Sequence, residues 1–239
     1  MTFQNQGDFG QPAGGQGVAL PGARSEVQGA FLTQAFFWMF AGLLITAAVA
    51  AYVQFNEGLL GFVGRSFMIL IFAQLGLALG IQFLIGRIGA TIALGLFFIY
   101  AASLGLTIGL IVSFYTATSV ATAFLSASAM FGGAALYGYT TKRSLAGIGG
   151  FAAMGAFGLF AAMIVNFFLG SDTLGYIISA IGVVIFTVLT AWDVQRISSG
   201  QLVQQLGSVE KAAVIGALHL YLDFVNIFLF LLRLFGSRR

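Results

Sequence analysis

The chain has 239 residues, of which 59% are hydrophobic and only 7% are charged, with a formal net charge of +3 at pH 7. Soluble domains carry about 25% charged residues, so this composition indicates an integral membrane protein in a lipid bilayer and leaves no room for a soluble catalytic domain. The sequence contains no cysteine, which excludes disulfides and thiolate chemistry, and its few basic residues sit at the ends of apolar runs, an arrangement that favours membrane topology over nucleic-acid binding.

Residues 1–28 are rich in glycine and glutamine and show no apolar periodicity. This composition predicts a disordered tail. Both prolines of the chain, Pro12 and Pro21, fall in it, so the helices that follow are expected to lack proline kinks. Residues 29–239 are expected to form one transmembrane domain, whose first apolar run acts as an uncleaved anchor.

Seven apolar runs follow, and each is long enough to cross a membrane as a helix. We place them at 30–53, 67–85, 91–112, 118–138, 147–169, 174–194 and 211–234. The runs are too long and too continuous for the alternating pattern of a membrane β-barrel, so the expected fold is all-α with seven transmembrane helices. The pairs Gly76/Gly80 and Gly105/Gly109 predict close helix contacts, and Gln74 predicts an interhelical hydrogen bond.

The basic residues predict the orientation. The tail and the loops after the second, fourth and sixth runs hold Arg24, Arg87, Lys142, Arg143, Arg196 and Lys211, whereas the intervening loops hold Arg65 alone. The positive-inside rule therefore places the N-terminus in the cytoplasm. Arg238 and Arg239 break this pattern, because seven crossings would put them outside. We favour a full crossing of the last run over a re-entrant one, since roughly 24 apolar-dominated residues suffice to span.

The sixth and seventh runs each carry one aspartate, Asp193 near the cytoplasmic end and Asp223 about a dozen residues inside. A charge at the centre of a membrane helix costs at least about 2.5 kcal/mol, so an intramembrane acid is a functional candidate. His219 and Asn226 lie at i−4 and i+3 from Asp223, on the same helix face, and Arg196 follows Asp193 at i+3. The two acids can meet only if the sixth run lies deeper in the membrane than its placement above, or if the seventh starts later.

Several segments together resemble the Bax inhibitor-1 family, particularly its bacterial branch, over roughly residues 25–239. They are FYTATSVATAFLSASAMFG, LYGYTTKRSLAGIG, VNFFLGS, AWDVQRI and LYLDFVNIFLFLLRLFG. Two positions depart from the family pattern. The family usually has Tyr-Asp-Thr-Gln where this chain has Trp192-Asp193-Val194-Gln195, and position 219, often serine in similar bacterial sequences, is His219.

The resemblance implies that the C-terminal helix is surrounded by the other six, and that the protein is a pH-sensitive calcium leak channel of the bacterial inner membrane. It implies that Asp193 and Asp223 form a proton-sharing pair and that an arginine of the second helix, here Arg87, latches the gate. The same two carboxylates would bind calcium transiently as the permeant ion, and no cofactor is expected. His219, Asn226 and Arg196 are candidate modulators of this pair.

Other functions are compatible with parts of the sequence. A non-conducting regulator that binds a membrane-bound AAA protease is an alternative suggested by bacterial relatives, and a proton-coupled exchanger is another. An intramembrane aspartyl protease is not expected, because Asp223 follows Leu220-Tyr221-Leu222 and not the Gly-x-Gly motif, and no proline occurs after Pro21. We therefore expect no enzymatic activity. Calcium flux by the purified protein in liposomes separates the channel from the regulator.

Overall fold

The computed structural model describes the backbone from residue 21 and the side chains from residue 29 to the C-terminus. Most of the predicted tail, residues 1–20, lies outside this range. Residues 21–28, which were assigned to the tail, instead belong to the first helix, which begins at Pro21. Proline suits the first position of a helix because its missing N–H has no partner there in any case.

Seven helices of the described range are long and apolar enough to cross a membrane, which confirms the predicted all-α fold. They are α1 (Pro21–Gln54), α3 (Phe67–Leu84), α4 (Ala90–Ser113), α5 (Ala117–Thr140), α6 (Ala146–Leu169), α7 (Asp172–Ser198) and α9 (Val209–Phe235). Hydroxyl caps begin several of them: the side chains of Thr116, Ser171 and Ser208 each accept a backbone N–H three residues ahead.

Two short helices, α2 (Glu57–Arg65) and α8 (Gln201–Leu206), occupy segments that the sequence analysis treated as loops. Asn56 caps α2 by accepting the N–H of Leu59 at 2.9 Å. Gly200 and Gly207 flank α8 with φ angles of 74° and 66°, a left-handed conformation that glycine adopts without steric cost. These two glycines allow the chain to turn at each end of α8 within the short connection between α7 and α9.

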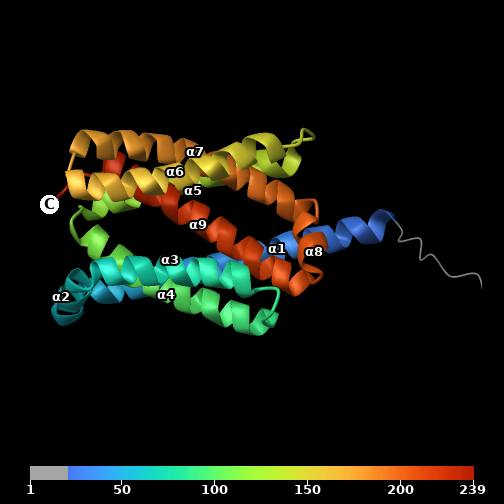
Figure 1. The fold of residues 1–239 in the computed structure, drawn as a ribbon, viewed down its shortest axis with the longest axis horizontal. Helices are drawn as coiled ribbons and strands as arrows, with labels where there is room; N and C mark the ends of the chain where they lie inside the picture. The colour runs from blue at the N-terminus through green and yellow to red at the C-terminus, as the bar shows by residue number, and fades with distance from the viewer. Residues whose placement is uncertain (1–20) are drawn as a thin grey trace, which may run out of the picture.

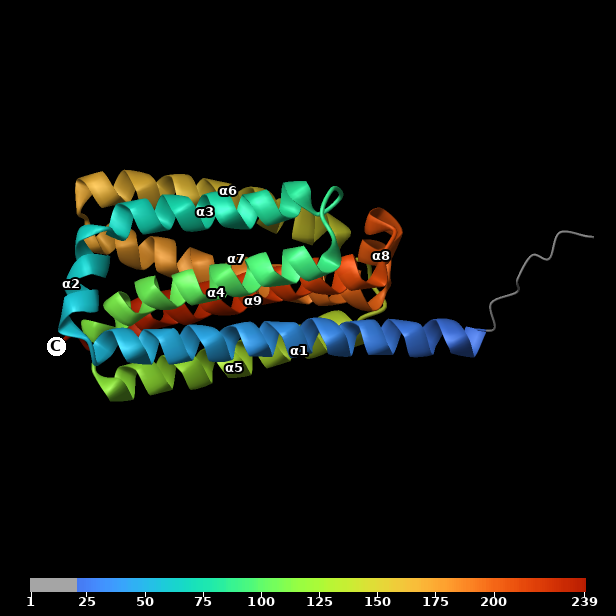
Figure 2. The same cartoon turned by 90° about the horizontal axis from the view of Figure 1, so that it is seen from below.

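Helix α9 lies in the middle of the bundle, as Figures 1 and 2 show. Of its most apolar stretch 78% is buried, whereas no other span exceeds 50%, so the implied central position of the C-terminal helix is confirmed. It contacts α1, α4, α5, α7 and α8. Helices α3 and α6 are peripheral, with α3 against α4 and α6 against α7.

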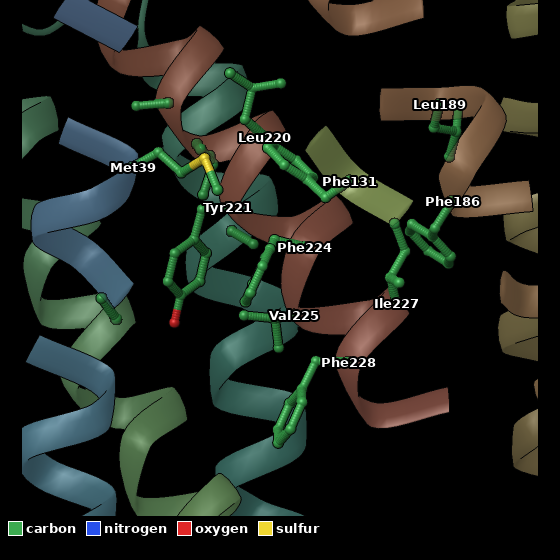
Figure 3. Close-up of a cluster of buried hydrophobic side chains, with 14 of the residues drawn as sticks. Met39, Phe131, Phe186, Leu189, Leu220, Tyr221, Phe224, Val225, Ile227 and Phe228 are labelled. Carbon is green, nitrogen blue, oxygen red and sulfur yellow. The ribbon is translucent and has the colours of Figure 1, made fainter. Parts of the chain in front are cut away.

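Aromatic side chains fill the space around the middle of α9. Figure 3 shows Tyr221, Phe224 and Phe228 projecting from successive turns of this helix. The ring of Phe224 packs edge-on against Phe131 and Phe124 of α5, with centroids 5.6 and 5.5 Å apart. Such edge-to-face pairs are favoured by the ring quadrupole, and here they leave the centre of the bundle closed.

Close helix contacts occur at one of the two predicted glycine pairs. A Cβ at Gly105 would lie 2.8 Å from the carbonyl oxygen of Thr46, and one at Gly109 would lie 2.9 Å from that of Ala50. These glycines let α4 pack directly on the backbone of α1. The prediction for Gly76 and Gly80 is wrong within this chain, because a Cβ at either meets no atom within 4 Å. The predicted interhelical bond of Gln74 is confirmed, since its amide donates to the carbonyl of Ser103 and the hydroxyl of Thr107 on α4, both at 2.8 Å.

The C-terminus is fastened at the end of the bundle opposite the loop that holds Lys142 (Figure 1). Helix α9 runs for 27 residues without reversal, about 40 Å at 1.5 Å per residue, a length that fits the favoured full crossing better than a re-entrant turn. Beyond it, the N–H of Thr116 donates to the carbonyl of Ser237 at 3.1 Å. Asp172 lies 3.8 Å from Arg233 and 3.9 Å from Arg238, which partly offsets the positive charge at this end.

Candidate functional site

Helices α7 and α9 run antiparallel, and contacts along them define their register. Gly216 packs on Ile197 and Gly182 packs on Phe230, and between these points His219 lies opposite Asp193. Helix α7 continues to Ser198, four residues past its predicted end at 194, which sinks Asp193 deeper into the bundle. This is one of the two conditions under which the acids were expected to approach each other.

Asp193 is buried, with 6% of its surface exposed, and one of its oxygens is shared by two partners. Its Oδ1 accepts a hydrogen bond from Nη1 of Arg196 at 3.1 Å and lies 3.4 Å from Nδ1 of His219, which makes no hydrogen bond within the described residues. Nη2 of Arg196 donates to Gln205 of α8 at 3.3 Å, and the guanidinium lies over the Trp192 ring. Arg196 therefore ties the short helix α8 to the acid.

Asp223 lies one helical turn deeper than Asp193. It is 4% exposed and lies near Thr190 and Asp193 of α7. Thr190 is three residues before Asp193 on α7, an axial offset of about 4.5 Å. The hydroxyl of Thr190 donates to the Phe186 carbonyl at 2.8 Å.

The Oδ2 atom of Asp223 has no hydrogen-bond partner in the described part of the chain, nor does a hydrogen bond between the two carboxyl groups occur there. An unsatisfied buried polar group costs about 1–3 kcal/mol. Asp223 thus has an oxygen that can accept a hydrogen bond from a water or bind a cation.

A small cavity of about 110 Å³ leads toward these groups from the end of the bundle that carries Lys142. It is bounded by Gln82, Ile85, Arg196, Leu202, Gln205, Leu206, Ile215 and His219. We call it the vestibule. Its volume corresponds to a few waters at about 30 Å³ each. Arg196 and His219 both line it, so the partners of Asp193 are reached from this side, while aromatic packing around α9 closes the other.

The predicted site residues are only partly brought together. Asp193, Asp223, His219 and Arg196 gather at one place, but His219 faces Asp193 across the helix interface and not Asp223, its neighbour on α9. Arg87 is exposed in the turn between α3 and α4, and no ion pair links it to either aspartate in the described residues; Arg196 takes the place beside the acid. Asn226 donates to the carbonyl of Leu222 at 2.8 Å within its own helix, so it does not orient Asp223.

Sequence reasoning missed Thr190 and Gln205. Thr190 could have been found by its spacing, because it lies at i−3 from Asp193 on the same helix face. Gln205 carried no such signal, since its approach to Arg196 depends on the fold of α8. Among the described residues, no group of three or more histidine, aspartate or glutamate side chains is arranged to hold a metal ion.

Comparison with known proteins places this chain in a family. The family model for the inhibitor of apoptosis-promoting Bax1 matches residues 28–239. The chain is 41% identical over 215 residues to the inner membrane protein YbhL of Escherichia coli K12, covering 87% of this chain and 92% of YbhL. It is 38% identical over 218 residues to an uncharacterized protein of Borreliella burgdorferi, covering 89% and 94%, and 41% identical over 209 residues to one of Deinococcus radiodurans, covering 87% and 90%. The chain is therefore an integral membrane protein of the Bax inhibitor-1 family.

Proposed function

We propose that this protein is a cation leak pathway, with calcium as the permeant ion, whose opening is set by protonation around Asp193 and Asp223. The observation that carries the proposal is a pair of buried carboxyl groups one helical turn apart at the centre of the bundle. One is held by Arg196 and the other has a free oxygen. Ionisable groups buried within a membrane bundle are costly and commonly mark ion or proton pathways.

The arrangement supports a closed state in which the acids are approached through the vestibule, from the end of the bundle that carries Lys142. The positive-inside rule places this end on the cytoplasmic side. Arg196 bridges Asp193 on α7 to Gln205 on α8, and both arginine and glutamine line the vestibule. While Asp193 is charged, this bridge holds α8 beside the entrance. We assign the latch role to Arg196, because Arg87 makes no contact with the acids in this state.

Protons weaken the Asp193–Arg196–Gln205 bridge in two ways. Protonating Asp193 removes the charge that holds Arg196, so the contact depends on the ionised carboxylate. Protonating His219 places a second positive charge 3.4 Å from the same Oδ1 atom, where it competes with Arg196. Both events release α8, so the leak increases as the pH falls.

The acids also supply what a permeant cation needs. Calcium is a hard cation that takes six to eight oxygen ligands, and the carboxyl oxygens of Asp193 and Asp223 with the Thr190 hydroxyl offer fewer than that. Such a site passes calcium without holding it.

The test is calcium entry into liposomes that contain only the purified full-length protein and an internal calcium dye, measured over a range of pH. We expect entry that rises on mild acidification and exceeds that of protein-free liposomes. Correctly folded protein that gives no calcium entry at any pH would refute the proposal. The alternative function, a non-conducting regulator of a membrane-bound AAA protease, would then be favoured.

A further inference from the structure

A second, larger cavity of about 510 Å³ lies at the same end of the bundle as the vestibule, where α1, the end of α5, the end of α7 and the start of α8 meet. It shares no described lining residue with the vestibule. Its walls carry the ammonium of Lys142, the hydroxyls of Tyr139, Thr141 and Ser144, and the amide of Gln201. The described lining contains no carboxylate, and the described residues contribute hydrogen-bond donors and one positive charge.

The donors are available because of how the 141–145 loop is built. Thr141 and Ser144 use their oxygens to accept the N–H groups of Arg143 and Ala146, each at 3.4 Å, which leaves both hydroxyl hydrogens free to donate. Lys142 makes no ion pair or hydrogen bond among the described residues. The loop itself is fixed by Gln195, which accepts from the N–H of Leu145 and donates to the carbonyl of Arg143, both at 2.8 Å.

A cluster of hydroxyl donors around an ammonium group suits an anion with several acceptor oxygens, such as a phosphate group. The surroundings on the membrane side are apolar. Leu136 lies one turn deeper than Tyr139 on the same face of α5 and is 64% exposed, and Phe40 of α1 is 60% exposed. A Cβ at Gly132 would meet no atom within 4 Å, so this stretch of α5 leaves room for an acyl chain.

Phe36 of α1 packs against Phe131 of α5 with ring centroids 6.3 Å apart, so the two helices meet through these side chains. We propose that the cavity at the ends of α5 and α7 binds the phosphate headgroup of an anionic phospholipid, whose acyl chain follows the surface between α1 and α5. A soluble phosphate compound shares the headgroup chemistry but not the chain. Polar donors line the cavity at the end of the bundle, and open apolar surface continues from it toward the middle of the membrane. This combination favours a phospholipid over a soluble phosphate compound.

The experiment measures binding to the full-length protein in an uncharged detergent, by native mass spectrometry and by thermal unfolding. The probes are dioleoyl phosphatidylglycerol, the zwitterionic dioleoyl phosphatidylcholine, and glycerol phosphate as the soluble compound. We expect phosphatidylglycerol to be retained and to raise the unfolding midpoint, and the other two probes to have little effect.

Two variants test the site itself. Lys142→Gln should weaken phosphatidylglycerol binding about fivefold, the value for one basic side chain near an anionic membrane surface. Its control, Lys211→Gln, removes the same charge at the same end from a side chain that bonds the Gly86 carbonyl outside the cavity, and should bind normally. Gly132→Leu fills the open space below and should weaken lipid retention with the headgroup site unchanged.

Equal retention of phosphatidylglycerol and phosphatidylcholine would overturn the proposal. Equal weakening by Lys142→Gln and Lys211→Gln would overturn it too, since binding would then follow net charge alone. Binding of glycerol phosphate as tight as that of phosphatidylglycerol, lost in Lys142→Gln, would reassign the cavity to a soluble phosphate compound. None of these measurements depends on calcium flux, so they stand apart from the proposed leak.

Discussion

Replacing Asp193 with asparagine should open the protein at neutral pH. The amide keeps the size of the side chain and an oxygen for calcium, but it removes the charge that accepts from Arg196 at 3.1 Å. A hydrogen bond to a charged group contributes about 1.5–3 kcal/mol, and each 1.4 kcal/mol is a factor of ten. We therefore expect the ratio of open to closed protein to rise roughly 10- to 100-fold.

The assay is initial calcium entry into dye-loaded liposomes at a series of pH values. Asp193→Asn should leak at neutral pH as fast as the unaltered protein does in mild acid, and its pH profile should be flat on the acid side. Arg196→Gln breaks the same contact from the other partner and should behave alike. The double variant should add little, because each single change already removes the interaction.

Glu210→Gln is the matched control for charge. Glu210 is exposed at the start of α9 and bonds Ser208 at 2.7 Å, so the variant removes one acid from the same end without touching the bridge. Its leak should equal that of the unaltered protein. Asp223→Asn leaves the Asp193–Arg196 bridge in place, so it should keep the acid rise and should lower calcium entry at every pH, because it removes a carboxylate from the pathway. If folded Asp193→Asn keeps the original pH profile, the reasoning about the bridge is wrong.

Three further predictions concern the titration, the packing and the topology. His219→Gln removes the competing imidazole beside Asp193, so the acid rise in calcium entry should become shallower. An unchanged liposome profile would exclude a role for this histidine. Gly138→Val should lower the thermal unfolding midpoint, because a Cβ there would collide with the carbonyl of Ala191 and overpacking costs about 1–3 kcal/mol. Gly132→Val, in open space, should leave the midpoint unchanged. Equal midpoints for the two variants would contradict the α5–α7 packing. A reporter inserted at residues 142–144 should read cytoplasmic and one after Arg239 should read external, and the same reading at both sites would contradict seven crossings.

The seven spans could be predicted from the sequence because their cause is local. A run of apolar residues long enough to cross a bilayer has few alternatives to a helix, since its backbone polar groups must be satisfied within the segment. The fourth predicted element makes the point: an apolar run at 118–138 became α5, Ala117–Thr140. Asp193 and Asp223 could be singled out for the same reason, because the cost of a buried charge depends on where it stands in its own run.

The short helix α8 could not be predicted in this way. Its bounds depend on left-handed turns at Gly200 and Gly207 and on packing against α7 and α9, and neither is visible in six residues of mixed polarity. With α8 unplaced, Gln205 had no known neighbour. The family resemblance suggested Arg87 as the latch, whereas the structure places Arg196 between Asp193 and Gln205, which is why we propose Arg196 for that role.

What the sequence by itself determined was the number of membrane helices, the central acids and the end of the bundle that carries most of the basic residues. Only the tertiary structure decided which side chains on α7 meet which on α9. That register follows from contacts such as Gly182 with Phe230 and Gly216 with Ile197, where a small residue on one helix admits a large one from the other. Because this fit is a property of two helices packed together, it set His219 against Asp193 and left Asp223 one turn deeper, with an oxygen that has no partner among the described residues.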